Sequence, residues 1–250
     1  MRNLLQFTYL QALCCIFPVI IFAALALSKF VTIPFIPRYD LILLICVAGQ
    51  VFMLASKLET WDEFKVICLF HIIGLGLELY KVQMGSWSYP EEAFSKVGGV
   101  PLYSEFMYAS VASYICQSWR RMNLHMYHWP KPFWAVGISV LIYFNFFTHH
   151  FTYDIRWILK CLLLIIFFRT VVTFELREKL FKMPMIIAFL LIGFFIWIAE
   201  NIVTFLGAWQ YPNQAVAWSL VHIGKISSWF LLVIISVIIV AQLKRVKYKT

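Results

Sequence analysis

The sequence predicts an all-α membrane protein with eight transmembrane helices, arranged as two parallel four-helix repeats with both termini in the cytoplasm. Of its 250 residues, 62% are hydrophobic and only 13% are charged, whereas soluble domains have roughly 45–50% apolar and about 25% charged residues. This composition excludes a soluble domain and equally excludes a disordered chain. A short motif that recurs in the second half predicts the two repeats.

Eight apolar stretches approach the length of about 20 residues that crosses a bilayer as a helix. They cover residues 9–29, 39–56, 64–80, 102–119, 132–148, 153–174, 184–206 and 217–240. The loops between them are short, and the longest covers residues 81–101, so no soluble domain is expected. The first stretch loosely resembles a signal peptide, but its length and the even number of spans favour an uncleaved first span.

Lysine and arginine are distributed unequally between the predicted loops. With both termini inside, 13 of the 21 basic residues lie on the cytoplasmic side: Arg2, Lys57, Lys65, Arg120, Arg121, Lys131, Arg177, Lys179, Lys182, Lys244, Arg245, Lys247 and Lys249. The outer side has five, Lys29, Arg38, Lys81, Lys96 and Arg156, and the spans contain Lys160, Arg169 and Lys225. Because cytoplasmic loops carry an excess of Lys and Arg, this bias predicts the orientation. The net charge of +9 therefore reflects topology, and no nucleic-acid partner is predicted.

The ends of the third and seventh spans share the pattern E-x6-G-x-W-x-Y-P. The copies consist of Glu78, Gly85, Trp87, Tyr89 and Pro90, and of Glu200, Gly207, Trp209, Tyr211 and Pro212. An ordinary aromatic belt explains Trp and Tyr after a span, but it does not explain the shared spacing of Glu and Gly. The second copy of the pattern follows the first by almost half of the chain length, and four predicted spans lie in each half. We therefore expect a first repeat over residues 1–122 and a second over residues 123–250, related by an axis along the membrane normal.

Most ionisable residues in or beside the spans gather at the outer end on this topology, and the cytoplasmic half has little that is comparable except Arg169. Ionisable groups in a membrane are costly, and each is a functional candidate by default. Glu78, Glu105 and Glu200 are the predicted catalytic acid/base residues. The predicted substrate-binding residues are Trp87, Tyr89, Tyr103, Tyr108, Asn201, Trp209, Tyr211, His222 and Lys225.

Helical spacing places several of these residues on shared faces. His71, Gly74 and Glu78 lie at i, i+3 and i+7 of the third span, where Gly74 leaves room for a neighbour. Two further faces combine polar and aromatic residues: Gly193, Trp197, Glu200 and Thr204 on the seventh span, and Trp218, His222, Lys225 and Trp229 on the eighth. Such faces are costly to expose to lipid, so they are expected to line a polar, carboxylate-containing pocket near the outer face.

Structural interpretations of the same residues remain open. Glu78 and Glu200 can instead lock helices together as ion pairs with Lys225, Lys160 or Arg156. His71 can be a core histidine bonded to a backbone carbonyl, and His149 and His150 an interfacial pair. The six cysteines are interpreted as buried apolar thiols. No spacing comparable to H-E-x-x-H supports a metal site, and neither a metal nor another cofactor is predicted.

The segment from Glu78 to Glu91, ELYKVQMGSWSYPE, resembles the signature of an uncharacterised bacterial family of multi-pass membrane proteins, the YoaT type. The resemblance covers the whole chain. It implies a multi-pass protein of the bacterial cytoplasmic (inner) membrane. It implies no activity, because the function of the family is not established.

A weaker resemblance is to carotenoid-pathway membrane proteins of the heterodimeric lycopene cyclase type. In that pattern an acidic residue is followed by W-x-Y/F, a Gly-rich turn and Pro-Leu-x-Glu. The corresponding residues here are Glu78, Trp87, Tyr89, Gly98-Gly99, Pro101, Leu102 and Glu105. The cyclase pattern often has a paired acid where this chain has only Glu105, and the second half has no Pro-Leu-x-Glu. The resemblance therefore implies a common scaffold rather than cyclase activity.

Three classes of function are compatible with the sequence. The first is an intramembrane enzyme acting on a lipid or isoprenoid, in which buried carboxylates transfer protons and aromatic walls stabilise a carbocation. The second is a transporter or binding protein for a small solute, which the repeat suits equally well. The third is a structural subunit whose buried charges only hold helices together. Membrane lipid is the expected partner, and the oligomeric state is left open.

Overall fold

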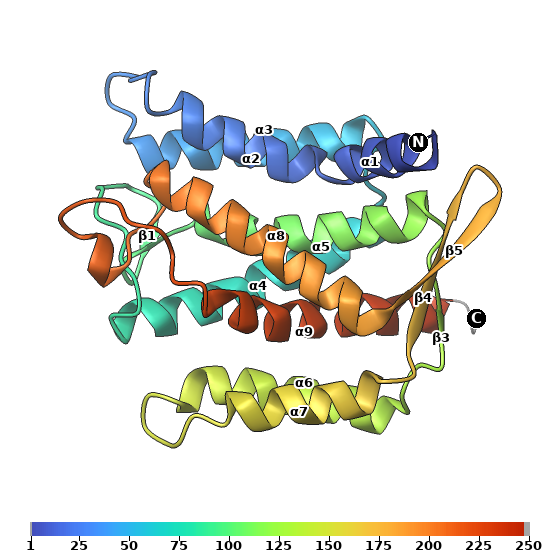
Figure 1. Cartoon of the computed structure of the whole chain (residues 1–250). Coiled ribbons are helices and arrows are strands. Elements are labelled where there is room, and N and C mark those ends of the chain that lie inside the picture. Colours follow the sequence, from blue (N-terminus) through green and yellow to red (C-terminus); the bar gives the residue numbers. More distant parts are fainter. Residues whose placement is uncertain (1, 248–250) are drawn as a thin grey trace. The chain divides into compact units, whose positions relative to one another are not determined.

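The computed structural model describes residues 2–247, which form a mostly helical protein (Figure 1). The α-helices of this part are α1 (Arg2–Cys14), α2 (Ile16–Leu27), α3 (Arg38–Ala55), α4 (Trp61–Gln83), α5 (Ser104–Arg121), α6 (Pro132–Thr148), α7 (Arg156–Phe167), α8 (Met185–Phe205) and α9 (Lys225–Lys247). The other elements are β1 (Lys96–Val97), β2 (Val100–Pro101), β3 (His125–Tyr127), β4 (Val171–Leu176), β5 (Lys179–Pro184) and the 3-10 helix η1 (Pro212–Gln214). Of the C-terminal basic cluster, Lys249 and the side chains of Lys244, Arg245 and Lys247 lie outside the described part.

Three helices of the described chain are long and apolar enough to cross a membrane. They are α3, α4 and α8, with mean hydropathies of 1.7, 1.5 and 2.4. The pair α1 and α2 makes a fourth if it is one bent span. The helix α6 and the segment Lys225–Ala241 of α9 are apolar but shorter. The helical class and the membrane-type helices are therefore confirmed, whereas eight crossings remain a prediction.

The first predicted span consists of two helices instead of one. The helix α1 ends at Cys14 and α2 begins at Ile16, and the two meet at 61°. Pro18 is the third residue of α2, and its ring nitrogen cannot donate to the Cys14 carbonyl four residues earlier. Proline is tolerated in the first turn of a helix but not in its interior, which places the break before it.

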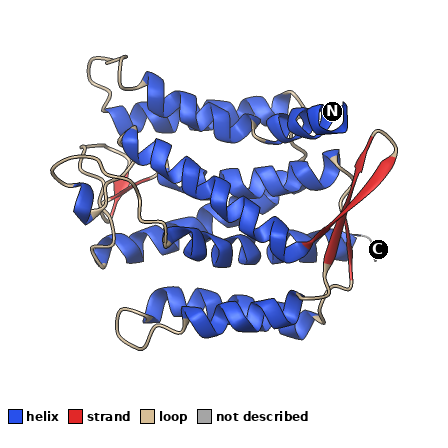
Figure 2. Ribbon diagram, viewed as in Figure 1, coloured by secondary structure: helices blue, strands red, loops and turns tan. Residues whose placement is uncertain are grey.

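The expectation of an all-α protein is wrong in two short regions. Antiparallel β1 and β2 form one small sheet, and β3, β4 and β5 form another in that order (Figure 2). The sixth predicted span extends to residue 174, but α7 ends at Phe167 because the β-branched run of residues 170–173 favours a strand. Between β4 and β5, Arg177 and Glu178 both have positive φ, which a tight hairpin turn requires.

The last predicted span begins too early. The helix α9 starts at Lys225, so the proposed helical face from Trp218 through His222 does not form. The N–H of Gly224 donates to His222 Nδ1 at 3.1 Å, and the N–H of Lys225 donates to the His222 carbonyl at 2.9 Å. These bonds form a turn before the helix, and Gly224, a weak helix former, lies at the boundary.

The chain divides into two compact units. Unit 1 comprises the described parts of Met1–Gln11, Ser118–Ile198 and Val221–Thr250, and unit 2 comprises Ala12–Gln117 and Ala199–Leu220. Within unit 1, α6 lies beside α7 and α9. Within unit 2, α2 lies beside α3 (Figure 1), and their apolar side chains contribute to a core that also contains Tyr89 and Tyr103.

The helix α4 begins with a capping box, in which Thr60 Oγ1 accepts from the Glu63 N–H at 3.2 Å and Glu63 Oε2 accepts from the Thr60 N–H at 2.9 Å.

The two helices that carry the repeated pattern, α4 and α8, end in the same way. After α4 the chain turns at Gly85, with φ +65°, and after α8 it turns at Gly207, with φ +73°. Glycine adopts this left-handed conformation without a Cβ penalty, so the pattern places a turn after each glutamate.

Candidate functional site

Glu78 lies near the end of α4 in unit 2, and only 3% of it is exposed. Its Oε2 accepts hydrogen bonds from the Trp87 indole and the Tyr89 hydroxyl, both at 2.8 Å. Its Oε1 accepts from the Tyr108 hydroxyl at 2.7 Å. The loop after α4 supplies Trp87 and Tyr89, and α5 supplies Tyr108. Three neutral donors therefore occupy both oxygens of this carboxylate.

These contacts differ from the ion pairs that a purely structural role predicts for Glu78. In the described chain, Glu78 has no basic ion-pair partner. One candidate partner, Arg156, binds Asp154 Oδ2 through its Nε at 2.6 Å and also donates to Ser228 Oγ at 3.3 Å. Glu78 is therefore a buried carboxylate surrounded by aromatic donors.

Glu200 makes the corresponding contact in the second copy of the pattern. It is 3% exposed, and its Oε1 accepts a hydrogen bond from the Tyr211 hydroxyl. Tyr211 follows Glu200 by 11 residues, as Tyr89 follows Glu78. Burial, together with the neighbouring glutamate charge, raises the pKa of Tyr89 and of Tyr211 well above the ordinary value. Both hydroxyls therefore stay protonated and donate to the carboxylates.

The two patterned loops meet within unit 2. Ser88 and Gln210, which occupy equivalent positions in the two copies, form an antiparallel bridge with N–H to carbonyl distances of 2.9 Å in both directions. Next to this bridge, the Trp87 and Tyr211 rings pack edge to face with centroids 6.1 Å apart. The bridge therefore brings the Glu78 and Glu200 networks together.

Three further predicted binding residues belong to the same region. Tyr103 is fully buried, its ring packs edge to face against Tyr89 at 6.2 Å, and its hydroxyl donates to the Ala208 carbonyl. Trp209 packs against the apolar core of unit 2. Asn201, the neighbour of Glu200 in the sequence, is 9% exposed. Tyr103 therefore contacts the Glu78 network through Tyr89, and all three residues belong to unit 2.

Glu105 lies on the first turn of α5 and contacts α4. Its Oε2 is 3.7 Å from Nδ1 of His71, and the two side chains are 13% and 19% exposed. The His71 ring packs edge to face against Phe106 with a centroid distance of 4.5 Å. His71 therefore faces a carboxylate, and all three predicted acids belong to unit 2.

The structure does not join every predicted site residue to this region. His222 and Lys225 belong to unit 1, whereas the other ten belong to unit 2. His149 and His150 are also in unit 1, where His149 Nδ1 lies 3.0 Å from the Asn145 carbonyl. Across residues 2–247 there is no group of three or more His, Cys, Asp or Glu side chains that could hold a metal ion.

A buried carboxylate near the start of α4 was missed by the sequence reasoning. Glu59 is 3% exposed, its Oε2 accepts from Gln50 Nε2 at 2.5 Å, and its Oε1 accepts from the Ser113 hydroxyl. Glu63, in the capping box, is 2% exposed. Glu59 and Glu63 therefore add buried carboxylates near the start of α4 that the sequence analysis did not predict. In the sequence, the pattern Thr60-x-x-Glu63 is typical of a capping box, and it indicated an ordered start of α4.

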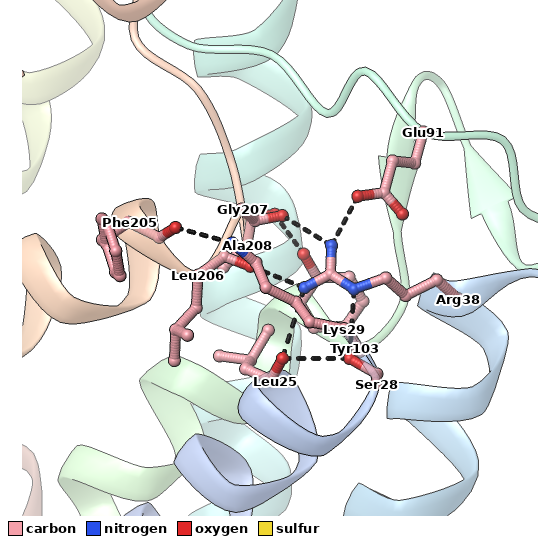
Figure 3. Close-up of polar contacts among 10 residues, drawn as sticks. All are labelled: Leu25, Ser28, Lys29, Arg38, Glu91, Tyr103, Phe205, Leu206, Gly207 and Ala208. Carbon is pink, nitrogen blue, oxygen red and sulfur yellow. Dashed lines mark hydrogen bonds and ion pairs between the residues drawn. The ribbon is translucent and has the colours of Figure 1, made fainter. Parts of the chain in front are cut away.

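Arg38, the first residue of α3, joins the ends of two other helices in unit 2 (Figure 3). Its guanidinium donates to the carbonyls of Leu206 and Gly207, just after α8, at 2.6 and 3.2 Å. It also donates to the Leu25 carbonyl of α2 at 3.4 Å and pairs with the Glu91 carboxylate. A cation at helix C-termini satisfies carbonyls that have no partner within the helix.

Lys29 has the same role in this cluster. Its Nζ donates to the carbonyl of Phe205, the last residue of α8, at 2.9 Å (Figure 3). Lys29 and Arg38 are two of the five basic residues that the charge distribution assigns to the outer side. In the structure both cations donate to backbone carbonyls at the ends of helices.

Gly74 provides the space in which Tyr108 reaches Glu78. A Cβ at Gly74 would lie 2.9–3.1 Å from three side-chain atoms of Tyr108. Gly74→Ala is therefore expected to displace Tyr108 and lower the free energy of unfolding by about 1–3 kcal/mol, as measured by denaturant unfolding in detergent. The control is Gly76→Ala on the same helix, where no neighbouring atom lies within 4 Å. It is expected to be neutral or to stabilise by up to about 1 kcal/mol, and equal losses in both variants would contradict the packing.

These observations define a helical protein with membrane-type helices and a paired set of buried glutamates. The chain belongs to the family described as "Protein of unknown function (DUF817)", whose model matches residues 3–237. It is 59% identical over 246 residues to "Uncharacterized protein YoaT" of Bacillus subtilis (strain 168), covering 98% of this chain and 93% of YoaT. No solved structure matches the chain. The resemblance to the YoaT-type family is confirmed, and the bacterial relative together with the apolar helices indicates a membrane protein.

Proposed function

We propose that this protein is an intramembrane acid/base enzyme acting on a lipid or isoprenoid. The observation that carries the proposal is the environment of Glu78, a buried carboxylate bonded to three neutral donors and to no base. Glu91, by contrast, is held in an ion pair with Arg38. A carboxylate without such a pair can accept or release a proton without breaking a structural ion pair.

The side chains around Glu78 suit this chemistry. The hydroxyls of Tyr89 and Tyr108 contact the carboxylate and can pass a proton to or from it. The Trp87 and Tyr211 rings pack edge to face against each other beside the acid, and aromatic rings can stabilise positive charge on a reacting hydrocarbon. Glu200 provides a second buried carboxylate in the same unit.

The proposed enzyme has eight membrane crossings, with both termini in the cytoplasm of a bacterial cell. Its repeats cover residues 1–122 and 123–250. Supporting this arrangement, the Glu–Tyr contact has the same spacing in both copies of the pattern, and Gly85 and Gly207 have the same left-handed conformation. The bridge between Ser88 and Gln210 relates equivalent residues, as an axis between parallel repeats requires. On this topology Glu78 and Glu200 lie near the outer face.

Lipid extracts test the proposed activity directly. Cells that produce the wild-type protein are expected to contain a lipid or isoprenoid species, identified by mass spectrometry, that is absent from cells without the gene. Glu78→Gln should abolish this species while the variant accumulates normally in the membrane. Glu92→Gln, a change in an exposed loop residue, serves as the control and should retain it. Full lipid turnover by Glu78→Gln would overturn the assignment.

Transport of a small solute is the second candidate. The bridge between the two patterned loops favours it, because symmetry-related segments often enclose the substrate site of transporters. Unchanged lipid extracts, combined with solute uptake into liposomes that Glu78→Gln abolishes, would support transport over the enzyme.

A further inference from the structure

Glu105 has a buried oxygen that the fold leaves unused. Its Oε2 faces His71, but its Oε1 is buried and has no hydrogen-bond partner among the described residues. Almost all buried polar atoms in proteins have a partner, and an unsatisfied one costs roughly 1–3 kcal/mol. Glu78 differs in this respect, because its two oxygens already accept three hydrogen bonds. A hydrogen-bond donor from outside the chain can therefore bind Oε1 of Glu105 without breaking a hydrogen bond within the protein.

The surroundings of this oxygen combine polar groups with a membrane-type helix. His71 is the eleventh of the 23 residues of α4, so it lies near the middle of a helix long enough to cross a membrane. Phe106 packs against the His71 ring. Ser104, also on the first turn of α5, is fully buried, and its Oγ likewise has no partner in the described chain. A ligand that reaches Glu105 from the lipid phase must therefore be largely apolar and carry a polar group.

We propose that Glu105 binds the polar group of the substrate, and that the substrate is an apolar chain bearing a hydrogen-bond donor, either a hydroxyl or an ammonium group. The donor binds Oε1 of Glu105, and His71 is a positioning residue that orients the carboxylate through Oε2. The inference rests on the proposed function, because it names the substrate class for the same acid/base site. It gives Glu105 and Glu78 separate roles in binding and proton transfer.

Three probes that share one hydrocarbon chain test this assignment on the purified full-length protein in lipid nanodiscs. Farnesol carries a hydroxyl donor, farnesylamine an ammonium donor, and farnesyl methyl ether an acceptor without a donor. The wild-type protein is expected to bind farnesol or farnesylamine at least about tenfold more tightly than the ether, since the ether leaves Oε1 unsatisfied. Whichever of farnesol and farnesylamine binds more tightly identifies the polar group of the substrate. Equal affinity for all three probes, or binding of none, would overturn the proposal.

Variants then test whether the preference for a donor depends on the Glu105 carboxylate. Glu105→Met keeps a side chain of similar length without an acceptor oxygen, and it is expected to reduce the tenfold preference to about twofold or less. Glu92→Gln, in an exposed loop, should retain the full preference. If a folded Glu105→Met variant retains the full preference for the donor probes, the proposal is also overturned. If this variant does not fold, the comparison of the three probes on the wild-type protein decides whether the proposal holds. Failure here leaves the lipid turnover test of Glu78→Gln unaffected, so the two proposals can fail separately.

Discussion

Replacing Arg38 by methionine is expected to lower the free energy of unfolding by about 2–4 kcal/mol, because it removes the charged donor of several partly buried hydrogen bonds. The Arg38 side chain is 15% exposed and binds Glu91 together with backbone carbonyls at the ends of α2 and α8. Methionine fills similar space but leaves these acceptors without a donor. Denaturant unfolding in detergent, followed by circular dichroism, measures the loss.

Two controls separate this network from an ordinary surface arginine. Arg156→Met removes a guanidinium that is 37% exposed and pairs with Asp154, so a loss within about 1 kcal/mol is expected. Arg38→Lys should have an intermediate effect, because a single ammonium cannot reproduce the planar five-donor geometry. A loss below 1 kcal/mol for Arg38→Met would show that the cluster does not hold the helix ends together.

Glu78→Leu is expected to destabilise the protein by about 3–6 kcal/mol. It leaves the Trp87 indole and the hydroxyls of Tyr89 and Tyr108 without their acceptor, and each unsatisfied buried donor costs roughly 1–3 kcal/mol. The added apolar burial offsets part of this loss. The same unfolding measurement applies, and the fluorescence of the tryptophans should change because the indole of Trp87 loses its hydrogen bond.

The matched variant is Glu78→Gln, whose carbonyl oxygen still accepts hydrogen bonds from the aromatic donors. It should lose about half as much stability as Glu78→Leu, which is why it is the better variant for testing activity. Glu92→Leu, in the exposed loop, provides a control for the polar-to-apolar change and is expected to stay within about 0.5 kcal/mol of the wild type. An unchanged stability of Glu78→Leu would mean that the three donors find other acceptors.

Local features of the sequence account for the contact that recurs in the two copies of the pattern. The pairing of Glu78 with Tyr89 and of Glu200 with Tyr211 spans only 11 residues in each copy. A helix end followed by a left-handed glycine is sufficient to turn the chain back toward the acid. The importance of Gly74 was also predictable, since helical spacing alone places it on the face of Glu78.

The incorrect predictions concern features that hydropathy does not encode. The sixth predicted span was drawn too long because apolar β-branched residues raise the hydropathy of a strand as well as of a helix. In the structure residues 171–176 form a strand that pairs with both β3 and β5. Glu59 lies outside the predicted spans, and its burial depends on Gln50 from α3 and Ser113 from α5. No periodicity in one segment reveals such a contact, because its partners come from other helices.

The amino-acid sequence is sufficient to predict a helical membrane-type protein with paired glutamates near the ends of two helices. Those properties depend on composition and short-range spacing, which act within a single segment. The folded chain adds three contacts that no single segment predicts. Tyr108 reaches Glu78, His71 faces Glu105, and Arg38 binds carbonyls at the ends of α2 and α8. These contacts join different helices, so they arise from how the helices pack, and packing is a property of the assembled chain.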